Sequence, residues 1–164
     1  MDRSVLLMMV LGLLVVLLGL MVFGWRARQR RQSTIAAPPP PPEDAGDVIG
    51  VFSARYVATT IAGEPLNRIA VNGLGFRSAA TVTVTDDGVL IERPGERLWW
   101  LDAASIRGVR RATWTIDGVV ESGGLHLVEW PLGNQFVDSY FRLDAPGPFD
   151  TALERVLHRE ASTS

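Results

Sequence analysis

The sequence predicts a mainly β domain, a seven-stranded antiparallel barrel or sandwich with a C-terminal capping helix, preceded by one transmembrane helix. Three observations support this fold class. An apolar run occupies the N-terminus, a proline tract follows it, and short β-like runs separated by turn residues fill the rest of the chain. We therefore expect a transmembrane helix over residues 1–25, a basic and proline-rich linker over 26–47, and a β domain over 48–164.

The N-terminal apolar run is long enough to cross a bilayer. Every residue from Val5 to Trp25 is apolar or glycine, and a helix of that length rises roughly 31 Å, close to the hydrocarbon thickness of about 30 Å. A secretory signal would have an apolar region of about 7 to 15 residues, followed by small residues at a cleavage site. This run ends in Trp25 and an arginine cluster, so we predict a retained anchor.

The arginines that flank the run predict its orientation. Arg3 alone precedes the run, and four arginines follow it: Arg26, Arg28, Arg30 and Arg31. Cytoplasmic flanks carry the excess of positive charge, so we expect the N-terminus outside and the β domain at the cytoplasmic face of the plasma membrane. Together with Trp25, whose ring suits the headgroup region, these four arginines form the predicted membrane interface.

The linker contains five consecutive prolines, Pro38 through Pro42. Such a tract favours an extended polyproline II helix, which rises about 3.1 Å per residue. We predict a stiff spacer that holds the domain away from the bilayer. The alternative is that the tract itself binds a proline-recognising partner.

The β domain begins with a series of strand and turn signals. Residues 81–85 alternate strictly, which places Val82 and Val84 on one face, and the Asp86-Asp87-Gly88 turn leads into a second strand over 89–91. Arg93-Pro94-Gly95-Glu96 matches a type II turn and leads into a strand over 98–101. Further strands are predicted over 50–56, 106–114, 125–130 and 136–143.

The C-terminal residues predict a short amphipathic helix. Thr151 is followed three residues later by Glu154, which is the spacing of a capping box. Leu153, Val156 and Leu157 then share one helical face. We expect this helix to begin at Thr151 and to cover an open end of the barrel.

Composition excludes several classes of site. All 16 basic residues are arginine and the chain has no cysteine, so it offers no Schiff-base lysine, no phosphate-loop lysine, no thiolate nucleophile and no cysteine-bound zinc. Residues 43–164 carry eleven arginines against seventeen acids, a net charge of −6. An acidic domain does not neutralise phosphates, so no nucleic-acid partner is expected.

The remaining polar residues give no catalytic pattern. His126 and His158 are far apart in sequence and lack metal-ligand spacing. A triad of a serine with His126 and Asp138 has no accompanying Gly-x-Ser-x-Gly elbow. Asp86 and Asp87 are adjacent and would point apart on a strand, so a turn role suffices. We expect no catalytic residue, no metal and no cofactor.

Arg107, Arg110 and Arg111 form the densest basic group outside the linker. Alternation along a strand would place Arg107 and Arg111 on one face. They are interpreted either as solvated strand charges or as a patch for an acidic partner or an anionic ligand.

Residues 83–111 resemble bacterial members of the pleckstrin-homology-like (PH-like) domains. The similar features are the hairpin strand Gly88-Val89-Leu90-Ile91, the Trp99-Trp100 pair, and residues 102–109 leading into the next strand. The resemblance implies seven antiparallel strands followed by one helix. The order of helix, proline linker and domain is similar to small actinobacterial single-pass membrane proteins. Residues 59–68 hold no basic cluster, so phosphoinositide binding is not implied.

These observations predict a non-enzymatic, membrane-anchored adaptor or scaffold that binds the bilayer through its N-terminal helix. Its domain would bind an unknown protein partner through an exposed sheet edge. Two alternatives stay open: an accessory subunit of an export or transport complex, and a small membrane-associated enzyme.

Overall fold

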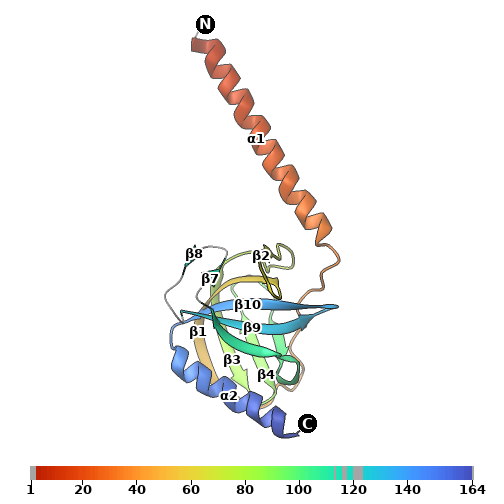
Figure 1. Cartoon of the computed structure of the whole chain (residues 1–164), viewed down its shortest axis with the longest axis vertical. Helices are drawn as coiled ribbons and strands as arrows, with labels where there is room; N and C mark the ends of the chain where they lie inside the picture. The colour runs from red at the N-terminus through yellow and green to blue at the C-terminus, as the bar shows by residue number, and fades with distance from the viewer. Residues whose placement is uncertain (1–2, 113, 116–117, 120–123, 164) are drawn as a thin grey trace. The chain divides into compact units, whose positions relative to one another are not determined.

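The computed structural model describes residues 3–112, 114–115, 118–119 and 124–163, with side chains over 3–111 and 124–159. The chain forms two compact units, Met1–Thr34 and Ile35–Ser164 (Figure 1). The second unit therefore begins at Ile35, ahead of residue 48, where the sequence predicts the start of the β domain and where the first strand begins.

The first unit is a single helix, α1 (Arg3–Arg31), in which no residue is buried. It is the one helix in the described residues that is long and apolar enough to cross a membrane. The helix continues beyond Trp25 because arginine is a good helix former. Arg28, Arg30 and Arg31 occupy its last turn, where positive charge opposes the negative end of the helix dipole.

The second unit is mainly β, as predicted, and its main sheet has eight antiparallel strands. These strands are β1 (Val48–Ile61), β2 (Glu64–Arg68), β3 (Ser78–Thr85), β4 (Gly88–Glu92), β5 (Trp99–Asp102), β6 (Gly108–Ala112), β9 (Leu125–Leu132) and β10 (Gln135–Leu143). A separate pair is formed by β7 (Trp114–Thr115) and β8 (Gly118–Val119), and the helices are η1 (Ala103–Ser105) and α2 (Pro146–Thr163). The unpredicted strand in the main sheet is β2, whose sequence EPLNR lacks an apolar alternation.

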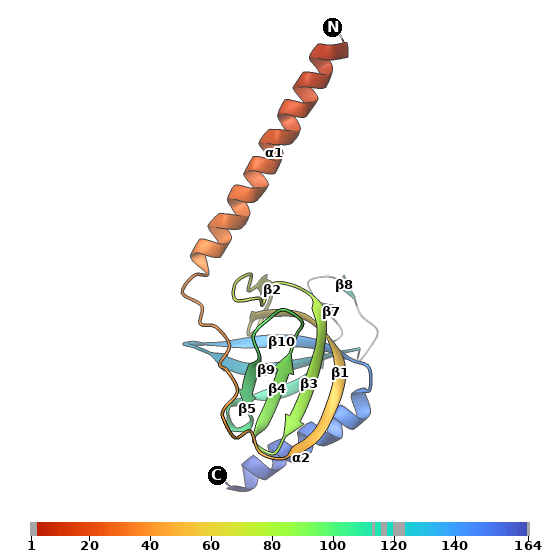
Figure 2. The same ribbon diagram turned by 180° about the vertical axis from the view of Figure 1, so that it is seen from behind.

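Strand β1 connects the two halves of the sheet. The order is β5-β4-β3-β1-β10-β9-β6, with β2 paired to β1 off this path. The first part of β1 pairs with β3, its later part pairs with β10, and a bulge lies between Tyr56 and Ala58. A bulge increases the bend of a strand. The sheet consequently folds over on itself and encloses the core (Figure 2).

Aromatic residues from both halves meet in the core. Trp99 of β5 and Trp130 of β9 are 2% and 1% exposed, and their ring centroids lie 6.4 Å apart. Tyr56 of β1 meets Trp99 edge to face at 5.1 Å. Trp100 is also buried. Trp99, Trp100 and Trp130 are therefore all buried in the folded sheet.

The predicted turns in the first hairpins are confirmed. Val84 pairs with Val89 across the Asp86-Asp87 turn. In the next turn the Glu96 N–H donates a 3.2 Å hydrogen bond to the Arg93 carbonyl. Gly95 has a φ of +76°, which is the left-handed conformation that a type II turn requires at this position.

Helix α2 covers one end of the folded sheet (Figure 1). It begins at Pro146, so the prediction of a start at Thr151 is wrong. Proline is favoured in a first helical turn because its missing N–H would have no partner there. Thr151 lies inside the helix, and its hydroxyl donates to the Gly147 carbonyl at 3.2 Å. The apolar face is confirmed, because α2 contributes four buried core residues: Phe149, Ala152, Leu153 and Val156.

Candidate functional site

The predicted arginine group lies at one end of the sheet, beside a groove between β6 and α2. Strand β6 is terminal in the described sheet and pairs with β9. The groove has a volume of about 250 Å³ and is lined by Val109, Arg110, Arg111, His126, Asp150, Leu153, Glu154 and Leu157. We call it the β6 groove. It combines an apolar floor with a charged rim, and it runs along a strand edge.

Asp150 joins α2 to two strands at the base of this groove. Its Oδ1 lies 2.8 Å from Nε2 of His126, which is 2% exposed. Its Oδ2 accepts a hydrogen bond from Nη2 of Arg111, the residue opposite His126 in the strand register. The His126 ring also meets Phe149 edge to face at 5.3 Å. These contacts hold α2 against β6 and β9.

Arg110 points to a different set of acids. Its guanidinium lies 2.8 Å from Glu129 and 4.0 Å from Asp138, a residue that is 3% exposed. Burial raises the pKa of Asp138, opposed by the hydrogen bond that its Oδ2 accepts from the Gly63 N–H. Arg110 itself is exposed, so a partner can reach its remaining donors.

Arg107 lies just before β6 and does not point toward Asp150. Its guanidinium stacks over the Phe136 ring, with Cζ 3.5 Å from the ring centroid. The structure therefore does not bring Arg107 and Arg111 together on one face. Arg110 and Arg111 line the β6 groove, and each is already paired with an acid.

The contacts of His126 do not form the triad of a serine, His126 and Asp138 that was considered from the sequence. His126 contacts Asp150 in place of Asp138, and its Nδ1 has no hydrogen-bond partner among the described residues. The described residues contain no group of three or more histidine, cysteine or acidic residues that could hold a metal ion. Asp86, in the first hairpin turn, pairs with Arg159 of α2 at 2.8 Å.

The predicted membrane-interface residues all belong to α1. They are Trp25, which is 48% exposed, and Arg26, Arg28, Arg30 and Arg31. The helix therefore continues beyond its apolar part as a basic segment.

Sequence reasoning missed Asp150 and its connections. Asp150 is 24 residues from His126 and 39 from Arg111. No local spacing reports such contacts. The helix start at Pro146 is the one signal that would have placed Asp150 on α2.

The fold and the sequence lead to one family. A comparison of the chain with curated proteins found no match. A family model described as Bacterial PH domain-like matches residues 35–156, from the first residue of the second compact unit to the buried face of α2. This match covers more than half of the sequence, and the mainly antiparallel sheet with one C-terminal helix agrees with the fold that the resemblance implied. The chain belongs to the bacterial PH domain-like family.

Proposed function

We propose that this protein is a non-enzymatic, membrane-anchored adaptor whose PH-like domain binds a protein partner. The observation that supports this role best is the β6 groove, which lies beside a terminal strand of the sheet. A terminal strand has backbone N–H and C=O groups that an added strand can pair with. The groove supplies pockets for the side chains of that added strand.

The chemistry of the groove suits an extended peptide segment with mixed character. Val109 and Leu157 are half-buried apolar residues that favour apolar side chains. Arg110 and Glu154 are exposed charges of opposite sign on the rim. Because rim charges mainly affect specificity and the association rate, the apolar floor would supply most of the affinity.

The anchor would be α1, placed in the plasma membrane with its N-terminus outside. The excess of arginine after Trp25 supports a cytoplasmic position for the domain. An enzyme that is active only outside the membrane, fused after Ser164, is expected to be inactive. Activity of this fusion would contradict the orientation.

The adaptor role predicts that substitutions in the β6 groove reduce retention of the partner bound there. We compare the double variant Arg110→Gln/Leu157→Gln with the matched control Val51→Gln/Arg142→Gln, whose residues are exposed on β1 and β10. Tagged full-length chains are purified from native membranes, and the co-purified proteins are quantified by mass spectrometry.

The expected result is a partner recovered with the wild type and with the control, and reduced at least about tenfold with the groove variant, which corresponds to about 1.4 kcal/mol. Circular dichroism of each purified chain checks that the domain is folded. Equal recovery with both double variants would contradict binding in the β6 groove.

A further inference from the structure

The free edge of β5 is covered by the chain's own proline-rich residues. We call residues 35–42 the proline segment. The Trp100 N–H donates a 2.9 Å hydrogen bond to the Pro39 carbonyl. The side-chain amide of Asn72 donates to the carbonyls of Ile35 at 3.0 Å and Ala36 at 3.1 Å. The segment is therefore bound along the domain at two places.

The burial of the segment repeats every third residue. Ile35, Pro38 and Pro41 are half-buried, whereas the residues between them and Pro42 are exposed. A polyproline II helix has three residues per turn, so residues three apart share one face. This burial period agrees with the polyproline II conformation that the composition favours, with one side of the segment against the domain.

The three described hydrogen bonds between the domain and the proline segment run in one direction. In each of the three bonds the domain supplies the donor, from Asn72 or Trp100, and the segment supplies a carbonyl. Proline has no backbone N–H, so residues 38–42 offer carbonyl acceptors and no backbone donors, whereas Ile35, Ala36 and Ala37 keep their N–H groups. The donors of Asn72 and Trp100 therefore suit a proline-rich chain, which supplies carbonyl acceptors and few N–H groups, whereas an ordinary strand would bring more N–H groups that need acceptors.

The loop that carries Asn72 is fixed from inside the core. The Tyr56 hydroxyl donates to the Leu74 carbonyl at 2.7 Å, and Nη1 of Arg93 donates to the Gly73 carbonyl at 2.9 Å. Neither bond involves the proline segment. The donor amide of Asn72 is consequently held in position by the domain itself.

Two further features support this pre-organisation. Arg93 is 2% exposed, and its Cζ lies 4.6 Å and 4.4 Å from the ring centroids of Tyr56 and Trp99. Asn72 has a φ of +56° and is the one non-glycine residue with a positive φ in the described chain. Such conformations are concentrated at functional sites.

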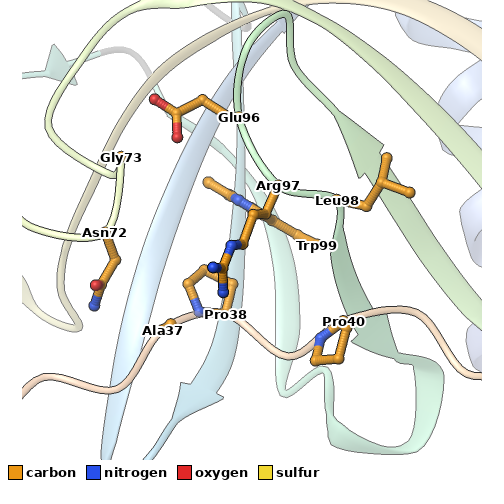
Figure 3. Close-up of a pocket in the computed structure, with 9 residues that line it drawn as sticks. All are labelled: Ala37, Pro38, Pro40, Asn72, Gly73, Glu96, Arg97, Leu98 and Trp99. Carbon is orange, nitrogen blue, oxygen red and sulfur yellow. The ribbon is translucent and has the colours of Figure 1, made fainter.

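The proline segment does not fill the surface that it covers. A cavity of about 470 Å³ lies between the segment and the domain (Figure 3). Its walls are Ala37, Pro38 and Pro40 on one side and Asn72, Gly73, Glu96, Arg97, Leu98 and Trp99 on the other. A segment with larger side chains than Ala37 would have room here.

We infer that Asn72 together with residues 96–100, here called the β5 strip, is a binding site for an extended proline-rich segment of a partner protein. The chain's own proline segment occupies this site in the structure. Displacement by a partner would release residues 35–42 from the surface of the domain. This surface is separate from the β6 groove, so the inference does not depend on the proposed function of that groove.

The test uses the absence of native cysteine. The full-length Ala37→Cys chain, in detergent micelles, carries a bimane label whose emission is quenched by nearby tryptophan, and Trp99 lines the same cavity as residue 37. A synthetic peptide with the sequence of residues 33–44 is added. The emission is expected to rise and saturate. Half-saturation in the millimolar range is expected, because a short tether gives the chain's own segment an effective concentration of about that order.

Three controls sharpen the result. A peptide with serine in place of the five prolines is expected to give no rise. A label on Val51→Cys, an exposed position outside the cavity, is expected not to respond. Asn72→Gly removes the amide but keeps a residue that accepts the positive φ, so it is expected to raise the basal emission and to weaken peptide binding while circular dichroism stays unchanged.

Several outcomes would overturn the inference. No response to the proline peptide, with basal emission raised by Asn72→Gly, would mean that the segment only covers the edge. An equal response to the serine peptide would remove the preference for proline. A rise in emission with protein concentration alone, with a dimer mass in light scattering, would make a second copy of the chain the occupant instead of a partner protein.

Discussion

The two terminal strands of the sheet, β5 and β6, have different neighbours. Beside β5 lies the proline segment, which accepts a backbone hydrogen bond from Trp100. Beside β6 lies α2, which is joined to the sheet through Asp150 and leaves a groove. One edge is covered by backbone without N–H groups, and the other is flanked by a helix and by charged side chains.

The difference teaches that a strand edge can be protected in two chemically distinct ways. An exposed edge invites pairing with other chains, and natural proteins blunt such edges with proline or charge. At β5, the covering segment contains five prolines, which have no N–H. A further strand therefore finds no backbone donors on these prolines to pair with. At β6, Arg110 and Arg111 supply charge beside the strand.

The largest expected effect comes from removing the side chain that joins the β5 edge to the core. Trp99→Ala is expected to lower the free energy of unfolding by about 3 to 5 kcal/mol, because Trp99 is buried against Tyr56 and Trp130. Urea unfolding of the full-length chain measures this. The control is Leu98→Ala, whose side chain is 40% exposed and for which a loss below about 1 kcal/mol is expected. Equal losses would show that the edge is not coupled to the core.

A smaller effect is expected at the β6 side. Asp150→Ala leaves the buried His126 and the half-exposed Arg111 without this shared acceptor, which is expected to cost about 1 to 3 kcal/mol. Glu154→Ala, an exposed position on the same helix and groove, is the matched control and is expected to change stability by less than about 0.5 kcal/mol. An Asp150→Ala chain as stable as wild type would indicate that apolar packing alone holds α2 in place.

The smallest effect concerns the pH dependence near β6. Burial raises the pKa of Asp138, so between its unfolded value of about 3.9 and the raised folded value the native state binds more protons than the unfolded state. Stability from this group is therefore lost as pH rises through that window. Asp138→Asn, which keeps an acceptor for the Gly63 N–H, is expected to remove this loss.

The measurement is urea unfolding of the wild type and of Asp138→Asn from pH 4 to pH 7.5. The stability of the variant relative to wild type is expected to increase with pH and then level off. A relative stability that decreases as pH rises would mean that the nearby Arg110 stabilises the Asp138 carboxylate more than burial disfavours it.

The hairpin elements were predictable because their signals are local. The alternation over 81–85 places Val82 and Val84 in the core, and Gly95 occupies the position where the turn needs a positive φ. In contrast, β2 was missed because its residues lack alternation, and it forms only through pairing with β1. The start of α2 was placed at Thr151 because a capping-box spacing occurs there by chance inside the helix.

The sequence by itself determined the apolar helix, the antiparallel β domain and the extended form of the proline tract, because each depends on periodicity or on the covalent geometry of proline. Only the tertiary structure decided where the tract lies. It placed Asn72 opposite Ile35 and Trp100 opposite Pro39, contacts that span dozens of residues. It also separated Arg107 from Arg111 and joined Asp150 to His126. Such contacts depend on how the sheet folds over on itself, and no local pattern in the chain encodes that closure.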